Sequence, residues 1–302
     1  MDETNNNATQ TENQTPIPDQ PQPEAAAPQH AAVYSGFSAN EMFCIDLLGY
    51  RPGNLLVGNS VFSMGILGGL KTIAKGVVGG EITSYTELIQ EGRRLSYERL
   101  KAEQETEQGI GVSSVSSELV FHGTNIEFLS VGSTLHKKSP SDGPKFTTSF
   151  DGQELFCLED SGYTPGSFVF GNVAYSIGVG RGFTGAFRKL AKGEVRQYSD
   201  IFTHTRQLAL TRITEEAKKA GVNSVVGIRT NILPLGTSGV QEMVMLGTAA
   251  THPHASNVNN QSGVITSDLT AEETWSMTKL GYMPIQLLLG TCLLYTSPSP
   301  RD

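Results

Sequence analysis

Two cysteines stand at matching places in two similar stretches of this chain, and thiolates are preferred ligands of soft metal ions. Cys44 follows Glu-Met-Phe, Cys157 follows Glu-Leu-Phe, and a third related stretch carries Ser276 instead. The chain has no Cys-x-x-Cys motif. Two interpretations therefore remain open. Each thiol packs as a small apolar side chain beside a phenylalanine, or the repeat-equivalent cysteines meet as a soft-metal sensor or store.

A second candidate for metal binding is a His-x-His pair. His252 and His254 flank Pro253 in a segment rich in Ser and Asn. Imidazoles at this spacing can hold an adventitious divalent ion, but a solvated linker explains them equally well. His122 and His204 do not correspond between the similar stretches, so they predict no site that belongs to a repeated unit.

Arginine and tyrosine recur more regularly than histidine. Arg93 and Arg206 occupy equal positions on two predicted helices, and Tyr85 and Tyr198 each precede them by eight residues. A guanidinium beside a phenol can contact an anion or a protein partner. The alternative is a structural ion pair, or an arginine that lies along a sheet edge.

Catalytic motifs are weak. The loop from Gly180 to Gly185 fits Gly-x-Gly-x-x-Gly, the pattern of a dinucleotide site, but the matching stretch of the first repeat keeps only the middle one of the three glycines, Gly69. A tight turn explains the loop as well, and a nucleotide-dependent enzyme stays as an alternative. No Gly-x-Ser-x-Gly elbow and no recurring Ser/His/Asp or Cys/His set is present, which predicts a protein that is not an enzyme.

These residues are placed by a repeated unit of roughly 115 residues, which indicates duplication of one module. The structural signature comprises Gly49, Tyr50, Pro52 and Gly58 in the first copy, and Gly162, Tyr163, Pro165, Gly171, Gly221 and Gly227 in the second. A third copy begins at about residue 271 and stops at Thr291. Residues 292–302 resemble a translated sequencing adapter, so we expect them to be non-native, and a native Pro/Ser tail is the alternative.

Each copy shows the same order of elements. Apolar runs with β-branched and aromatic residues predict strands, and apolar residues at helical spacing predict short glycine-weakened helices followed by one long helix. The expected strands are 55–65, 112–121 and 127–134, then 168–178, 223–233 and 242–249; the expected long helices span 85–100 and 198–217. The predicted fold class is α+β, with tandem β-α-α-β-β modules whose small, mostly antiparallel sheets are packed by helices.

Composition and charge limit the remaining classes of function. The formal net charge is −8, and most of it comes from an N-terminal segment that has five acidic residues and no Lys or Arg. The rest is near neutral, which argues against nucleic acid as a partner. No apolar run reaches the length of a membrane span, and no signal peptide is recognisable. Equivalent cysteines in separate repeats favour reduced thiols and a cytoplasmic protein.

We therefore divide the chain into a disordered tail (1–36), a first domain (37–136), a linker (137–152), a second domain (153–251), a linker (252–270), a truncated third repeat (271–291) and the adapter-like tail (292–302). A small sheet that carries helices on one side leaves bare edges and a bare face. Pairing between repeats, and further self-association, is the expected remedy.

Each copy resembles the YbjQ-like family of heavy-metal-binding domains. The family shows a Gly-Gly pair, a Tyr, an Arg eight residues later and a Gly-Ala-Asp-Ala-Val-Val-Gly-Ile-like strand entry. Gly79-Gly80, Tyr85 and Arg93 match in the first copy, and the stretch from Gly221 to Ile228 matches in the second. The first copy lacks the close match at the strand entry, and the second has Lys192 in place of the first glycine of the pair. The resemblance implies a β-α-β-β fold that assembles into rings of five in single-domain bacterial members.

From the repeats and the resemblance together we expect a non-enzymatic, self-associating binding or scaffold module whose main partner is itself. A divalent or soft metal ion is the only cofactor that the resemblance suggests.

Overall fold

The structure is a computed structural model of the chain, and it describes residues 33–63, 80–123, 125–139, 143–176, 193–194, 196–235, 240–255, 262–290 and 294–295. The chain divides into two units, Met1–Ala32 and Val33–Asp302, and only the second contains described residues. Most of the predicted tail, the loop at 180–185, most of the short predicted helices and most of the adapter-like tail lie outside these ranges.

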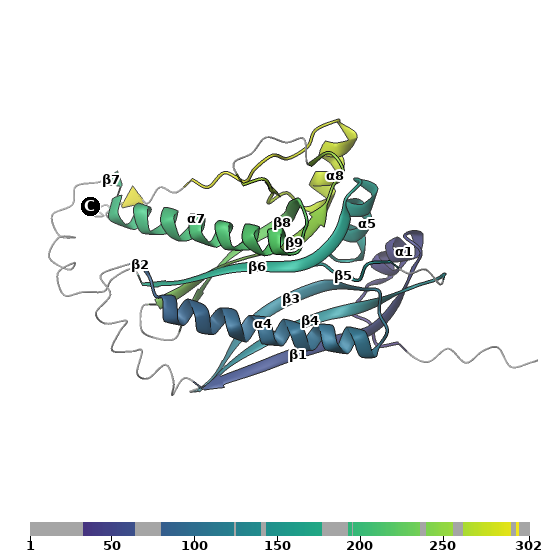
Figure 1. The fold of residues 1–302 in the computed structure, drawn as a ribbon, viewed down its shortest axis with the longest axis horizontal. Helices are drawn as coiled ribbons and strands as arrows, with labels where there is room; N and C mark the ends of the chain where they lie inside the picture. The colour runs from purple at the N-terminus through teal and green to yellow at the C-terminus, as the bar shows by residue number, and fades with distance from the viewer. Residues whose placement is uncertain are drawn as a thin grey trace, which may run out of the picture. The chain divides into compact units, whose positions relative to one another are not determined.

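Each of the two complete repeats forms a sheet of three long antiparallel strands, which confirms the predicted α+β class (Figure 1). The first sheet has the order β1 (Tyr50–Ser63), β4 (Asn125–Lys137), β3 (Gly111–His122), β5 (Phe146–Thr147). The second has the order β10 (Ile265–Thr266), β8 (Ser224–Pro234), β9 (Val240–Thr251), β6 (Thr164–Ser176), β2 (Gly80–Glu81). Two-residue strands β7 (Gly193–Glu194) and β11 (Leu294–Tyr295) form a separate pair.

One long helix covers one face of each sheet, as the apolar spacing predicts. Helix α4 (Thr83–Thr106) packs on β1 and β4, and α7 (Arg196–Lys219) packs on β6 and β9. The backbones touch at two signature glycines. A Cβ on Gly58 would lie 2.0 Å from the carbonyl oxygen of Ser96, and one on Gly171 would lie 2.3 Å from that of Ala209. Only glycine fits where helix and strand approach so closely.

Three short helices begin the repeats: α1 (Ala39–Leu47), α5 (Gly152–Asp160) and α8 (Ala271–Lys279). The sequence analysis missed them because it used these stretches only to establish the repeat. Each starts with a capping box formed by the pairs Ser38/Glu41, Asp151/Glu154 and Thr270/Glu273. Each is followed by a glycine of positive φ, namely Gly49, Gly162 and Gly281. Caps of both kinds recur because α1 and α5 turn into the first strands β1 and β6 in the same way, and α8 ends with the same kind of glycine.

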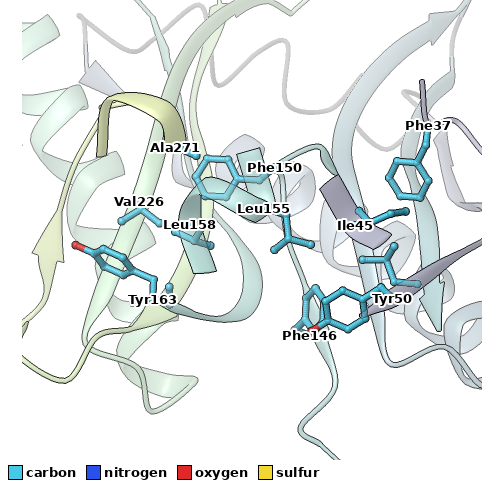
Figure 2. Close-up of a cluster of buried hydrophobic side chains, with 12 residues drawn as sticks. Phe37, Ile45, Tyr50, Phe146, Phe150, Leu155, Leu158, Tyr163, Val226 and Ala271 are labelled. Carbon is cyan, nitrogen blue, oxygen red and sulfur yellow. The ribbon is translucent and has the colours of Figure 1, made fainter. Parts of the chain in front are cut away.

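The three short helices pack in series, α1 against α5 and α5 against α8. A core cluster joins them, with Ile45 from α1, Leu155 and Leu158 from α5 and Ala271 from α8 (Figure 2). Aromatic rings of Tyr50 and Phe146 meet in the same cluster, with centroids 5.8 Å apart. The repeats therefore share a hydrophobic core at this end.

The segments predicted as linkers contain structure of their own. β5, inside 137–152, pairs in parallel with β3, and β10, inside 252–270, pairs in parallel with β8. Each connection thus adds an edge strand to the sheet that it leaves. A two-residue strand has no periodicity that a sequence could display.

The first repeat also extends the second sheet. Strand β2 follows β1 in the chain but pairs with β6 of the second sheet. Gly80 lies opposite Ser176, and Glu81 lies opposite Tyr175. Helix α4 contacts β6 as well as its own sheet, and the rings of Tyr97 and Phe168 lie 5.7 Å apart. The layers therefore alternate: first sheet, α4, second sheet, α7. This is the predicted edge and face pairing between repeats.

No helix in the described ranges is long and apolar enough to cross a membrane.

Candidate functional site at the junction of the repeats

Arg93 connects the two repeats from within the interior. It lies on α4, is fully buried, and pairs with Glu242 on β9 through two bonds, Nε to Oε1 at 3.1 Å and Nη2 to Oε2 at 2.8 Å. The other terminal nitrogen donates to the carbonyl oxygen of Ser117 at 3.2 Å and to its hydroxyl at 2.8 Å. The guanidinium thus reaches from its own sheet to the next. Arg93 thus forms an ion pair, and its partner Glu242 lies in the other repeat.

Neighbouring side chains of α4 add bonds to the same strand. The amide of Asn172 donates to the backbone oxygen of Thr86 at 3.2 Å, and the hydroxyl of Thr86 accepts from the backbone N–H of Ala174 at 2.9 Å. Tyr85 is buried in an apolar cluster that includes Ala174 and Leu235 of the second repeat. Burial raises the pKa of its phenol, so this side chain packs at the junction as a neutral group.

A second ion pair crosses the junction in the opposite direction. Arg212 on α7 donates to Glu81 on β2 at 2.8 Å and to the backbone oxygen of Asn172 at 2.7 Å. The recurrence of Arg99 with Arg212 and of Glu81 with Glu194 in the sequence was the signal that could have located it. The bond from Arg212 holds β2 against β6, which would otherwise be an edge strand of the second sheet.

Arg206, the counterpart of Arg93, has different surroundings. Its guanidinium donates to the carbonyl oxygen of Gly290 at 3.1 Å. It borders a cavity of about 390 Å³ that is also lined by Thr230, Ile232 and Asp268. The side chain of Tyr198 lies outside the described part of the structure, so the predicted Arg–Tyr pair of the second repeat cannot be placed.

The first repeat has its own counterpart of Glu242, which is Glu127. Glu127 lies opposite Val61 and Glu242 opposite Ala174, and each of these facing residues is three positions after the signature glycine of its copy. Glu127 is partly exposed, and its carboxylate pairs with His122 at 2.7 Å and accepts from the amide of Asn59 at 3.3 Å. These contacts, with His122 first, lower the pKa of Glu127.

The cysteines come together, but without a ligand set. Cys44 on α1 and Cys157 on α5 belong to helices that pack against each other, and both thiols are half-buried. Burial raises the pKa of both, and Cys44 is a further cause of the raised pKa of Cys157. Within the described ranges, no group of three or more Cys, His, Asp or Glu side chains is arranged to hold a metal ion.

His252 differs from the prediction of a solvated linker. It is buried, its ring lies 4.5 Å from that of Tyr163, and its Nδ1 accepts the backbone N–H of His254 at 3.2 Å. Burial lowers its pKa, which favours the neutral ring. His252 follows the last residue of β9, and Tyr163 precedes the first residue of β6. Since Thr251 and Thr164 face each other in the pair of these strands, the two rings lie side by side.

The sequence analysis missed a partly buried acid, Glu159. The phenol of Tyr50 donates to Glu159 Oε1 at 3.4 Å beside a cavity of about 370 Å³ that Lys137 and Phe146 also line. Burial raises the pKa of Glu159 to about 7, against the opposing effects of Tyr50 and Lys137. No sequence signal marks this acid, because its environment combines the first strand of one repeat with the first helix of the next.

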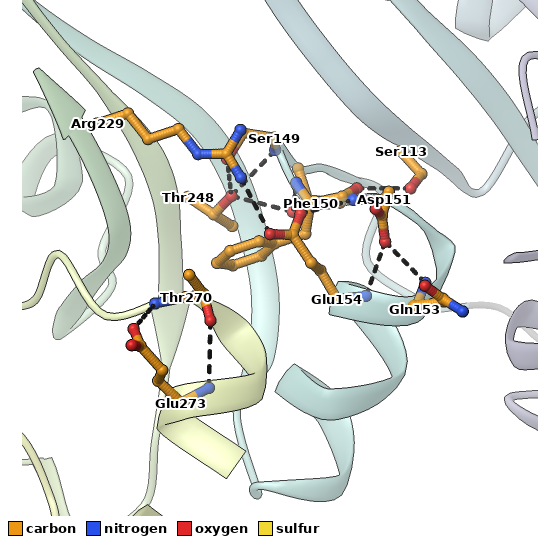
Figure 3. A network of polar contacts seen from close by, with 11 residues as sticks. Ser113, Ser149, Phe150, Asp151, Gln153, Glu154, Arg229, Thr248, Thr270 and Glu273 are labelled. Atoms are coloured by element: carbon orange, nitrogen blue, oxygen red, sulfur yellow. Dashed lines mark hydrogen bonds and ion pairs between the residues drawn. The ribbon is translucent and has the colours of Figure 1, made fainter. Parts of the chain in front are cut away.

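A polar network on the other side of α5 fixes the helix start (Figure 3). The carboxylate of Glu154 accepts a hydrogen bond from the guanidinium of Arg229 at 3.0 Å. The carboxylate of Asp151 accepts hydrogen bonds from the backbone N–H groups of Gln153 and Glu154. The hydroxyl of Thr248 accepts the backbone N–H of Ser149 at 3.0 Å. Burial raises the pKa of Glu154. These bonds anchor the connection between the repeats to the second sheet.

Comparison with known proteins places the geometry in context. The profile of a protein family described as "Putative heavy-metal-binding", YbjQ-like, matches residues 164–252. A UPF0145 protein of Thermotoga maritima is 40% identical over 81 residues, which are 27% of this chain and 76% of that protein. A UPF0145 protein of Clostridium perfringens is 32% identical over 87 residues, 29% of this chain and 81% of the relative.

A further match is longer than one repeat. An encapsulin nanocompartment protein of Mycobacterium tuberculosis is 28% identical over 205 residues, which are 64% of this chain and 76% of the relative. No solved structure matches the chain.

Proposed function

We propose, from the premise that this chain belongs to the YbjQ-like (UPF0145) family, that it is a self-associating scaffold or binding module without catalytic activity. The observation that carries the proposal is the buried Arg93–Glu242 pair. It joins two different surfaces of two similar modules, so the contact is heterologous. In a heterologous contact each module uses one surface to bind the next module and a different surface to bind the previous one. The first and last modules of such an array therefore each keep one binding surface without a partner.

Two further observations support the proposal. The two repeats share a core, and the first repeat contributes strand β2 to the second sheet, as modules that stabilise one another in an array do. The Mycobacterium tuberculosis relative is named for a nanocompartment, and its match covers 64% of this chain, more than one repeat. We extend the property of assembly from that name to this chain as part of the proposal.

Sedimentation velocity of the full chain over a wide range of concentration tests the proposal. We expect species larger than the monomer, with a population that grows with concentration. A single monomeric species at every concentration would reject the scaffold function.

A second candidate is a soft-metal sensor or store that uses Cys44 and Cys157. It is favoured by the packing of the two helices that carry these thiols and by the family's description. Titration of the full chain with Zn²⁺ or Cd²⁺, compared with a Cys44→Ser/Cys157→Ser variant, tests it. An unchanged stoichiometry in the variant would remove the cysteines as ligands. The nucleotide alternative stays a prediction, because its loop is outside the described residues.

A further inference from the structure

The cavity beside Glu159 combines an acidic side chain, a basic side chain and aromatic rings at the first junction of the repeats. Its volume of about 370 Å³ lies within the range of small-molecule sites. We infer that this cavity binds a small monocarboxylate with an aromatic or branched apolar body. The inference goes beyond the proposed self-association, because every residue that it uses belongs to a single chain.

The walls of the cavity come from both repeats and suit an apolar body. The rings of Tyr50 and Phe146 meet there, with centroids 5.8 Å apart (Figure 2). The other apolar lining residues are Ile110, Pro144, Tyr163 and Pro165. Gly162 and Thr164 also line the cavity and are exposed, so solvent reaches it. A small ligand can therefore enter and bury apolar surface against the rings.

The polar groups of the cavity act as donors when Glu159 is protonated. The phenol of Tyr50 donates to Oε1 of Glu159 at 3.4 Å, and burial raises the pKa of this acid to about 7. The ammonium of Lys137 lies at the wall, since its Nζ is 3.3 Å from where a Cβ on Gly143 would be. An ammonium has three N–H donors, so Lys137 can bind a ligand in addition to its contacts within the protein. A neutral acid beside an ammonium favours an anion.

The second junction shows that the packing of the repeats does not need this acid and this ammonium. Three cavity residues have counterparts there: Tyr163 for Tyr50, His252 for Lys137 and Thr278 for Glu159. The hydroxyl of Thr278 donates within its own helix, and in the described part the phenol of Tyr163 has no hydrogen-bond partner. Helix α8 nevertheless packs on α5 as α5 packs on α1.

An acid that the packing does not need, held where its ionised form is poorly solvated, points to a ligand. Groups with shifted pKa values gather where proteins bind or transform other molecules. Because Oε1 of Glu159 accepts from Tyr50, Oε2 carries the proton that a ligand carboxylate accepts. The second oxygen of the ligand accepts an N–H of Lys137, and the apolar body lies against the rings.

The protonation of Glu159 governs the charge of the cavity near neutral pH. Tyr50 and Lys137 are the neighbours that act on its pKa. Burial raises the pKa of Tyr163 to about 12 and lowers that of His252, so both rings are neutral at pH 7 and above. Charged groups of the surrounding elements form ion pairs of their own, Asp46 with Lys138, Lys145 with Glu105 and Lys279 with Asp160.

Isothermal titration of the full chain with phenylacetate and with isovalerate tests the inference. We expect saturable one-to-one binding with a Kd on the order of 1 mM, the range of so small a ligand. Because the ligand binds beside the protonated acid, affinity should fall about tenfold from pH 6 to pH 8. Titrations in buffers of different ionisation enthalpy should show that binding takes up a proton above pH 7.

Variants of the two polar residues locate the site. Glu159→Gln keeps an N–H donor, so it should bind with the same Kd at both pH values and take up no proton. Lys137→Met should raise the Kd about tenfold or more, and Lys137→Arg should restore binding because it keeps the charge. Lys138→Met is the matched control: Lys138 pairs with Asp46, so this variant should bind like the wild type. Circular dichroism confirms that each variant is folded.

The inference is overturned if neither acid binds saturably well above that concentration, or if benzylamine binds in their place. Acid binding that is equal at both pH values, or that Lys137→Met and Lys138→Met weaken equally, would place the ligand elsewhere and also overturn it. A pH dependence that Glu159→Gln abolishes, together with a loss confined to Lys137→Met, supports it. Sedimentation velocity is a separate measurement, so failure here leaves the scaffold proposal as it stands.

Discussion

Arg93 is a single side chain whose hydrogen bonds connect the two repeats in the interior. A buried guanidinium and a buried carboxylate each lose their hydration, and their attraction offsets this only when every hydrogen bond is made. Here Glu242 accepts two hydrogen bonds from Arg93 and Ser117 accepts two more. Removing one partner leaves the other charged, buried and unpaired.

We therefore expect Arg93→Met to lower the free energy of unfolding by about 3–5 kcal/mol. The double variant Arg93→Met/Glu242→Leu should recover a large part of that loss, because both charges are gone. Urea unfolding followed by circular dichroism measures both. Arg94→Met is the control: Arg94 is half-exposed and pairs only within its helix, so it should cost less than about 1 kcal/mol. Equal losses at both arginines would contradict the role given to Arg93.

Glu159 gives the junction a dependence on pH. Burial raises its pKa from the usual 4.5 to about 7. The folded state therefore binds a proton that the unfolded state releases between these values, and stability falls as pH rises through this window. Above pH 7 the folded state holds an ionised, poorly solvated carboxylate and is at its least stable with respect to this group.

Glu159→Gln should remove this dependence. Gln stays neutral and keeps an oxygen for the Tyr50 phenol, so the variant should match the wild type near pH 4.5 and exceed it at pH 8 by on the order of 2 kcal/mol. Urea unfolding at the two pH values measures the difference. Parallel pH profiles of variant and wild type would show that the carboxylate is not the titrating group.

At the scale of elements, the approach of each long helix to its first strand determines where the helix lies. The contact is backbone against backbone at Gly58 and Gly171. Helix α7 therefore contacts Gly171 of β6, and Leu287 and Leu289 pack on the hydrophobic cluster to which α7 contributes. This explains why the glycines belong to the repeat signature.

Gly171→Ala should destabilise the chain, since the new methyl would meet the carbonyl of Ala209 and the backbone nitrogen of Ile213. Overpacking of this kind costs about 1–3 kcal/mol or more, because a helix must shift. Gly290→Ala is the control: no atom lies within 4 Å of its added Cβ. Thermal unfolding should show a large drop in midpoint for the first variant and almost none for the second.

Sequence patterns predicted the long strands and helices because each has many residues that alternate or recur. β1 alternates between Leu56, Gly58 and Ser60, which are buried, and their exposed neighbours. The short helices were missed although Ser38/Glu41 and Thr270/Glu273 have the spacing of a capping box. The partner of Arg93 was not predictable, because Glu242 reaches it only through the stacking of one repeat on the other.

For the whole molecule, the alternation of sheets and helices means that residues of both repeats pack in the same hydrophobic core. Leu100 and Val112 of the first repeat pack with Phe168 of the second. Modules that share a core in this way unfold together when the energy of the interface exceeds the difference in their own stabilities.

We expect a single cooperative transition of the full chain. Trp275, the one tryptophan of the sequence, lies on α8 and donates to Asp160 on α5 at 2.6 Å. Its fluorescence should change at the same urea concentration as far-UV circular dichroism, and Arg93→Met, far away in the first repeat, should move both by the same amount. Two separated transitions would mean that the repeats are independent folding units.

Covalent duplication also changes what a mutation does. In an assembly of identical subunits, one codon specifies the same residue at every interface. A substitution that weakens one interface therefore weakens all of them. Here Arg93 and Glu242 are written once each, separately from Glu127 and Arg206. Selection can therefore alter the buried pair between the repeats without altering the equivalent positions Glu127 and Arg206.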